Sequence, residues 1–243
     1  MNREWLVPDW PAPARVRAFV TTRAGGVSEG DYASMNLGTR GGDDPERVAR
    51  NRLIVREQLP EVPGWLAQRH GIDVIDLDRE GPVDRAADAA VTTRPRRVCS
   101  VLTADCLPVL LCDAAGTRVG IAHAGWRGMA AGVIENTVAA LRANPADLLA
   151  WLGPAIGPDA FEVGPEVRAA FLTVDAGAQG AFRSHREGKF MADLYALARG
   201  RLARAGVTRV FGGGFCTWTE TARFFSYRRE KQSGRMGSFI WLE

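Results

Sequence analysis

Short apolar runs that end at glycine or proline recur along the chain and predict β-strands. The first spans 16–21 and leads into a Gly-Gly turn, and the last closes the chain at 236–243. Between them the same pattern predicts strand segments at 64–78, with a break at Gly71, at 87–113, with a break at Pro95, and at 148–158, 209–218 and 224–229.

Helices are predicted where apolar residues recur at helical spacing. Pro45 opens the first, with Asp44 as its N-cap, and further helices are predicted at 128–143, 164–172 and 193–207. Helices and strands interleave without strict alternation, and no repeat or linker divides the chain. We therefore expect an α/β fold of the mixed α+β kind: a single domain, residues 1–243, with mixed β-sheets flanked by helices.

One predicted hairpin brings two reactive residues together. If 106–125 turns over the four residues 114–117, Pro108 pairs with His123 and Cys106 faces Gly125. Side chains alternate between the faces of a strand, so Cys106 and His123 become diagonal neighbours on one face. Pro108 suggests that its strand is an edge strand or is irregular.

Three interpretations of this pair remain open. Cys106 can be a buried thiol and His123 a core histidine. Alternatively, His70, which we expect at the end of a strand, completes a zinc site whose fourth position is open, as in catalytic zinc centres. In the third, a histidine lowers the pKa of the Cys106 thiol in a Cys–His dyad. Thr103 and Asp105 add polar groups beside the cysteine, which a plain core disfavours.

Composition narrows the class of protein. The net charge is +3 and no concentrated basic stripe is present, which argues against nucleic-acid binding. No apolar run is long enough for a membrane helix, and no signal peptide is apparent. The four cysteines form no CxxC pair or dense framework, so we expect reduced thiols and a cytoplasmic protein, monomeric or homodimeric.

Eight motifs, in order along nearly the whole chain, resemble those of the YfiH-type laccase-domain family, known as polyphenol oxidases and purine nucleoside phosphorylases. They are TTRAGGVS, SMNLGTRGGDDPERVARNR, WLAQRHG, ADAAVTT, TADCLPVLL, IAHAGWRG, LGPAIGP and FFSYRR with SGRMGSFIWL. The resemblance implies a YfiH-like fold and a zinc or copper site at His70, Cys106 and His123. Arg69 departs from the apolar residue that is usual in the family.

The resemblance also implies the activity. It implies phosphorolysis of adenosine, inosine and guanosine, cleavage of methylthioadenosine, and deamination of adenosine. True multicopper oxidase chemistry needs imidazole-rich copper clusters, and three histidines in all argue against it. The alternatives are a Cys–His hydrolase or deamidase acting on a small amide, a weak copper-dependent phenol oxidase, and a metal-binding regulatory protein.

Candidate substrate residues complete the hypothesis. Phosphate favours arginine forks, and purines favour aromatic stacking. Asp105, the acid nearest in sequence to the ligand cysteine, is interpreted either as a catalytic proton carrier or as a structural residue that caps the turn, and His185 is expected to be a surface residue. The candidates for phosphate are Arg40, Arg127 and Arg228, those for ribose or base are Asn36 and Ser34, and those for stacking are Phe224, Phe225 and Tyr227. The alternatives are a solvated surface position for each arginine, loop capping for Asn36 and Ser34, and core packing for the aromatic residues.

Overall fold

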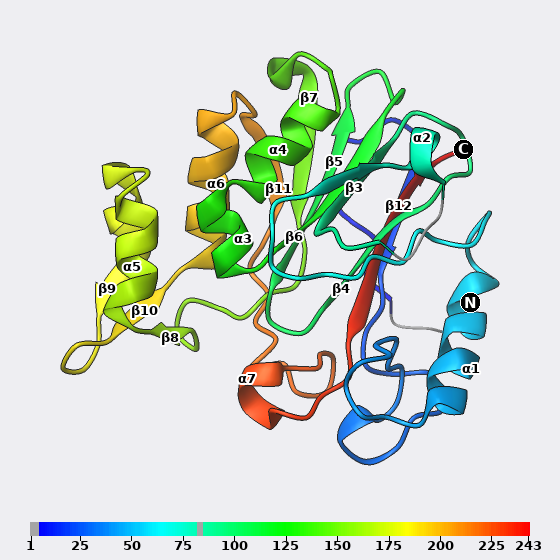
Figure 1. Ribbon diagram of the computed structural model, residues 1–243, viewed down its shortest axis with the longest axis horizontal. Coiled ribbons are helices and arrows are strands. Elements are labelled where there is room, and N and C mark those ends of the chain that lie inside the picture. The colour runs from blue at the N-terminus through cyan, green and yellow to red at the C-terminus, as the bar shows by residue number, and fades with distance from the viewer. Residues whose placement is uncertain (1–4, 82–84) are drawn as a thin grey trace.

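A mixed six-stranded sheet forms the centre of the molecule (Figure 1). The structure is a computed structural model and describes residues 5–81 and 85–243. Strand β5 runs antiparallel to both β6 and β7, whereas β11 pairs parallel with β7 and β2 pairs parallel with β3. In order across the sheet, the strands are β11 (Arg209–Gly212), β7 (Leu148–Leu152), β5 (Leu107–Asp113), β6 (Val119–Ala124), β3 (Ala89–Thr92) and β2 (Val74–Asp76).

Alternating side chains on the central strands build two cores. Odd-numbered residues of β5, such as Val109 and Leu111, pack against the helices, and even-numbered Leu110 packs against a second sheet. The helices on the first face are α3 (Trp126–Ala131), α4 (Val133–Ala140) and α6 (Leu194–Arg204), and α5 (Pro165–Leu172) extends the same core beyond α3. The predicted mixed α/β architecture is confirmed.

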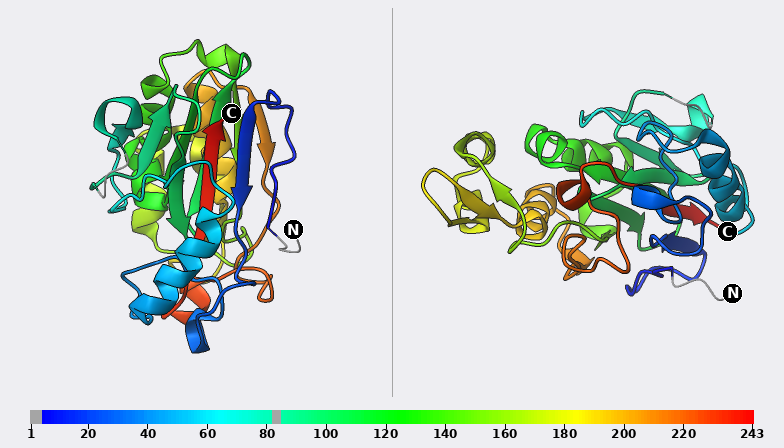
Figure 2. Two further views of the ribbon diagram at one scale, coloured as in Figure 1. Left: turned by 90° about the vertical axis from the view of Figure 1, so that its right-hand side faces the viewer. Right: turned by 90° about the horizontal axis from the view of Figure 1, so that it is seen from below.

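The second sheet is antiparallel and carries its own helix. Its strands, in order, are β1 (Val16–Val20), β12 (Met236–Leu242) and β4 (Cys99–Thr103), and helix α1 (Pro45–Arg56) covers its outer face. Asp44 caps α1 by accepting a hydrogen bond from the N–H of Glu46, as the sequence predicts. Figure 2 shows the two sheets face to face, with helices on the outside.

The remaining elements are short. A third small sheet, β8 (Glu162–Val163), β10 (Phe190–Ala192) and β9 (Phe182–Ser184), projects with α5 from one end of the molecule (Figure 1). Single-turn helices α2 (Leu77–Glu80) and α7 (Tyr227–Glu230) complete the fold with three 3₁₀ turns. Within the described ranges, no helix has the length and hydropathy that a membrane crossing requires.

Several local predictions are wrong. The strands predicted at 148–158 and 209–218 end at Leu152 and Gly212. Most of 64–73 makes only isolated bridges, and 224–229 ends in helix α7 because Ser226 caps it through the N–H of Arg229. The helix predicted at 128–143 breaks at Gly132, whose φ of 110° is outside the helical range. Strand β5 is interior, not an edge.

Pro108 is tolerated in this interior strand because another group replaces its missing N–H. The Gly153 N–H donates to the Pro108 carbonyl at 3.0 Å, so these two residues face each other just beyond the end of β7. The Gly153 carbonyl cannot receive an N–H from proline. The Tyr195 hydroxyl lies 3.2 Å from it and 3.1 Å from the Phe215 carbonyl, and its one proton is shared between these two acceptors. Tyr195 therefore couples helix α6 to the central sheet.

Candidate metal centre and its cavity

Two of the three expected ligands lie on one face of the β5–β6 hairpin. Pro108 pairs with His123, as the predicted register requires. Cys106 immediately precedes β5, and its Sγ lies 3.7 Å from Nε2 of His70. The candidate ligand atoms of His70, Cys106 and His123 all lie within 4.8 Å of one another. The fold thus brings together the three residues that the sequence singles out.

His70 reaches this group from a loop with an unusual backbone. Its φ is 60°, in the left-handed region that non-glycine residues seldom adopt. Two glycines of the AGWRG motif make room for it: a Cβ on Gly125 would lie 2.8 Å from His70 Cδ2, and a Cβ on Gly128 would lie 2.7 Å from the Gly71 carbonyl. The motif therefore serves close packing at the site.

A buried carboxylate, Asp88, holds the centre together. Its Oδ1 accepts hydrogen bonds from the His70 N–H at 2.9 Å and from His123 Nδ1 at 2.8 Å. Its Oδ2 accepts from the N–H groups of Arg69 and Gly71, at 3.1 and 2.7 Å. A carboxylate on Nδ1 leaves His123 Nε2 for a metal and fixes the ring, which is the usual support for a metal-binding histidine.

Sequence reasoning missed the role of Asp88. Asp88 lies in the ADAAVTT motif, which supports the family resemblance without assigning the residue a role. One feature of the sequence indicates its role: Asp88 is a single acid in an apolar strand segment. A carboxylate buried in such a segment needs hydrogen-bond partners.

The charges of the centre favour a thiolate. Burial opposes ionisation of Cys106, but the positive charge and hydrogen bond of His123, with a further contribution from His70, lower the thiol pKa to about 6. Burial likewise opposes a charge on His123, and the facing thiolate with Asp88 raises its pKa to about 9. Asp88 is itself desolvated, yet its hydrogen bonds lower its pKa to about 2.

The donor set fits zinc. Two imidazoles and one thiolate are ligands that zinc prefers, and three protein ligands leave one position for water or substrate. The ligands have the support of Asp88 and open onto a cavity of about 640 Å³ that His70, Cys106 and His123 help to line. This arrangement is typical of a catalytic rather than a purely structural metal site.

The cavity has a strong excess of positive charge. Among the described residues that line it, Asp105 carries the sole carboxylate. All three arginines predicted to bind phosphate are present, and sequence reasoning missed the other two. The five lining arginines are Arg40, Arg52, Arg127, Arg228 and Arg235.

The other predicted substrate residues have different fates. Tyr227 lines the cavity and is 56% exposed, whereas Phe224 and Phe225 are fully buried in the core. Asn36 is buried outside the cavity lining, with its amide engaged by neighbouring backbone and by Asp43. His185 is on the surface, 3.6 Å from a Glu162 oxygen, as expected.

Asp105 connects the metal centre to helix α7. Its φ of 91° turns the side chain away from the course of the strand. Oδ1 accepts from the Thr217 hydroxyl and Oδ2 from the Arg228 N–H, both at 2.6 Å. These two hydrogen bonds give Asp105 a positioning contact between Cys106 and the segment that carries Arg228.

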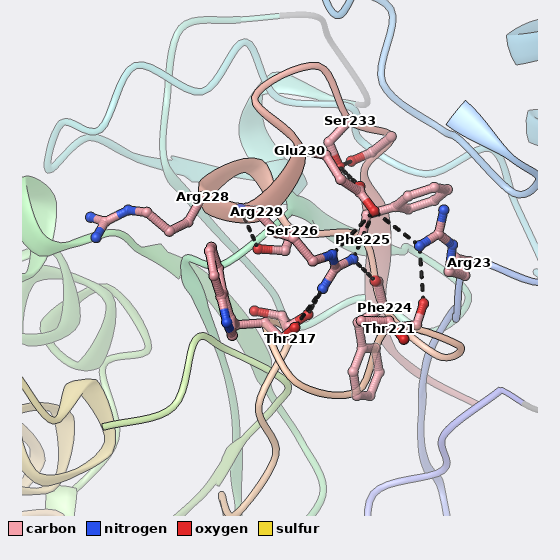
Figure 3. Close-up of polar contacts among 12 residues, drawn as sticks. Arg23, Thr217, Thr221, Phe224, Phe225, Ser226, Arg228, Arg229, Glu230 and Ser233 are labelled. Atoms are coloured by element: carbon pink, nitrogen blue, oxygen red, sulfur yellow. Dashed lines mark hydrogen bonds and ion pairs between the residues drawn. The ribbon is translucent and has the colours of Figure 1, made fainter. Parts of the chain in front are cut away.

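A network of arginines anchors the same segment (Figure 3). The Arg229 guanidinium donates to the carbonyls of Thr217, Trp218 and Phe224 and pairs with Glu230. Arg23 also pairs with Glu230, and its Nη1 lies 3.2 Å from the Oε1 atom that Arg229 contacts. Arg228 extends in the opposite direction from Arg229 in Figure 3; it lines the cavity and donates from Nη1 to the Glu162 carbonyl at 2.7 Å.

Comparison with known proteins decides the family. The family described as multi-copper polyphenol oxidoreductase laccase matches residues 17–243. The chain belongs to this laccase family. The Escherichia coli protein named purine nucleoside phosphorylase YfiH is 56% identical over 239 residues, covering 98% of each chain. The Pseudomonas aeruginosa purine nucleoside phosphorylase is 55% identical over 240 residues, again covering 98% of each chain.

Two solved structures agree with the fold. A crystal structure of a Neisseria meningitidis protein is 52% identical and superposes with a TM-score of 0.96, covering 99% of this chain and 100% of that one. The YlmD protein of Geobacillus stearothermophilus, at 30% identity, gives a TM-score of 0.88 over 100% and 97% of the two chains. Both the YfiH-type resemblance and the fold class are therefore confirmed.

The description of the laccase family as multicopper does not match the donors in this chain. Oxidases of that kind need a trinuclear cluster and a separate blue-copper site, both rich in histidine. Across residues 5–81 and 85–243, His70, Cys106 and His123 are the one group of three or more metal donors, and His185 lies outside it. The site fits a single ion.

Proposed function

We propose that this chain is a zinc-dependent purine nucleoside phosphorylase. It transfers the ribosyl group of adenosine, inosine or guanosine, and the methylthioribosyl group of methylthioadenosine, to inorganic phosphate. The observation that carries the proposal is one cavity that combines the His70–Cys106–His123 centre with five arginines. The names of the relatives support it. Zinc suits the donor set better than copper, which is the alternative metal.

The dimensions and lining of the cavity suit the two substrates. A volume of about 640 Å³ lies within the range that small-molecule sites occupy. Its apolar and aromatic wall, including Trp65, Trp126, Phe161 and Tyr227, offers flat surfaces to a purine. Arginine forks match the oxygen geometry of phosphate, and the positive field attracts it.

In the proposed reaction, no protein side chain forms a covalent bond to the substrate. A phosphate oxygen forms a bond to C1′ of the ribose as the C1′–N9 bond breaks, and the sugar passes through an oxocarbenium-like state. The bond electrons leave with the purine, which takes up the proton that hydrogen phosphate gives up. The cavity arginines hold the phosphate in line, and the aromatic wall holds the base. When bound by His70, Cys106 and His123, zinc would supply a Lewis acid to this cavity.

Deamination of adenosine at C6 is the second activity that we propose for the same centre. It needs a metal site with an open position facing the base, and the three-ligand geometry supports this. The H-x-E signature of the familiar zinc deaminases is absent from the sequence. Each Asp105 oxygen accepts one hydrogen bond, which leaves further acceptor capacity for the role of proton carrier.

A Cys–His hydrolase is the competing function, and the lowered thiol pKa of Cys106 favours it. Chelation distinguishes the two, since a dyad keeps its activity without metal and loses it to a thiol alkylator. The test incubates the purified protein with adenosine, with and without phosphate, while bound metal is measured. Adenine and ribose 1-phosphate formed only with phosphate, one zinc per chain, and loss of both in Cys106→Ala are expected. Zinc binding without turnover of any of the four nucleosides refutes the proposal.

A further inference from the structure

Arg235 has cationic donors that no protein group uses. It lies between helix α7 and strand β12 and lines the cavity. Nη1 donates to the carbonyls of Ser233 and Gly234, at 2.6 and 3.0 Å. Among residues 5–81 and 85–243, no carboxylate pairs with this guanidinium, and Nε and Nη2 have no acceptor.

The surroundings make this lack of a partner costly. Arg235 is half-buried, and desolvation lowers its pKa despite the negative groups of Cys106 and Asp105 nearby. Asp105 lies near Arg235 but forms no ion pair with it; its oxygens accept from the Thr217 hydroxyl and the Arg228 N–H. A cation partly removed from water, with free donors beside a cavity, is stabilised when an anion enters.

The position of Arg235 is built by its neighbours. The Oδ1 atom of Asn36 accepts from the N–H groups of both Arg235 and Gly38, each at 2.9 Å. A Cβ on Gly38 would lie 2.8 Å from Arg235 Cγ, so glycine makes room for the side chain. The Asn36 amide thus joins the loop that carries Arg40 to the segment that carries Arg235.

The neighbouring ring leaves the guanidinium edge free. Arg235 Cζ lies 5.5 Å from the centroid of the Tyr227 ring. Stacking of this kind uses the face of the guanidinium and leaves its N–H groups available in the plane. Tyr227 lies in the same cavity, so a bound anion and an aromatic surface for the base are adjacent.

We propose that Arg235 is the principal phosphate-binding residue of the cavity, with Arg40 on the adjoining loop as its partner. The ligand is a tetrahedral oxyanion, and we assign it to inorganic phosphate rather than to the 5′-phosphate of a nucleotide. This assignment rests on the phosphorylase function proposed above and deepens it. Asn36, expected from the sequence to touch the nucleoside, acts instead by fixing the Arg235 backbone.

Kinetics of Arg235→Gln and Arg235→Lys test the assignment. In Arg235→Gln, KM for phosphate rises about tenfold or more, equivalent to about 1.4 kcal/mol, while KM for adenosine stays unchanged. In Arg235→Lys, KM for phosphate lies between the values of the unaltered protein and of Arg235→Gln, because lysine keeps the positive charge and lacks the forked guanidinium. Arg168→Gln is the matched control: this arginine also lies over a ring, Phe190, at 5.2 Å, but outside the cavity. An unchanged KM for phosphate in Arg235→Gln overturns the assignment.

A measurement on the unaltered protein does not depend on the folding of a variant or on turnover. Phenylglyoxal modifies accessible arginines, and mass spectrometry locates the product. Inorganic phosphate is expected to protect Arg235 and to leave Arg168 reactive. Protection by adenosine 5′-monophosphate alone, or no protection, overturns the assignment. If the protein shows no phosphorolysis while phosphate protects Arg235, the proposed function fails and the anion site stands.

Discussion

Replacing Asp88 by asparagine tests whether this carboxylate organises the metal centre. Each of its two oxygens accepts two hydrogen bonds. Asparagine substitutes an NH₂ group for one oxygen, which then faces two donors. Two hydrogen bonds are lost, and each buried donor left unpaired costs about 1–3 kcal/mol, so the expected destabilisation is about 2–6 kcal/mol. This loss is a large fraction of a typical free energy of unfolding, which is about 5–15 kcal/mol.

The same substitution has a separate effect on metal binding. Without a fixed carboxylate on Nδ1, the His123 ring loses its orientation, and zinc affinity is expected to fall about 10- to 100-fold. Denaturant unfolding in the presence of chelator measures the stability of the metal-free protein, and competition with a chromophoric chelator measures the affinity.

Asp78→Asn provides the control. Asp78 is a carboxylate that accepts hydrogen bonds from Thr92 and Thr93 outside the cavity. Its substitution lowers stability and leaves zinc affinity unchanged. If Asp88→Asn also binds zinc as tightly as the unaltered protein, the reasoning about His123 is refuted.

Three further predictions rest on single contacts. Gly125→Ala pushes a methyl group into the ligand side chains and should abolish tight zinc binding. Gly180→Ala is the control, because no atom lies within 4 Å of its Cβ, and it should bind zinc normally. Metal analysis of both variants tests this. Tyr195→Phe removes the hydroxyl that serves the Gly153 carbonyl and should lower the urea-unfolding free energy by about 1–3 kcal/mol, with an unchanged value as the contrary result. The pKa of Asp88 is lowered from 3.8 to about 2, so its charge stabilises the metal-free protein by about 2 kcal/mol above pH 4, and this contribution is lost as pH falls from about 4 to 2. Unfolding free energies are measured between pH 4 and pH 2 for the unaltered protein and for Asp88→Asn. If the unaltered protein loses no more stability than the variant over this range, the prediction is contradicted.

Local patterns explain why the hairpin could be predicted. Its turn length sets the pairing of Pro108 with His123, and alternation then decides which side chains share a face. The pattern that predicts this pairing lies within twenty consecutive residues, so the prediction required no knowledge of contacts far apart in the chain. The same reasoning placed the N-cap of α1 correctly.

Other features depend on groups far apart in the chain. The strand predicted through His70 is wrong because Asp88 collects three consecutive N–H groups there, which a strand would direct to alternate sides. Nothing near Pro108 in sequence indicates that Tyr195 supplies the missing hydrogen bond. Arg235 could not be distinguished from the other arginines, because its significance lies in the acceptors it lacks.

The junction at Asp88 has a consequence for transplanting the site. The hairpin alone, about twenty residues, carries Cys106 and His123 and would be the obvious fragment to graft onto another scaffold. Such a graft would leave behind the loop of His70, and the carboxylate that sets its backbone comes from a third segment of the chain. A functional copy must therefore include three non-contiguous pieces in their native arrangement, and recombination between relatives should succeed only at crossover points that keep all three from one parent.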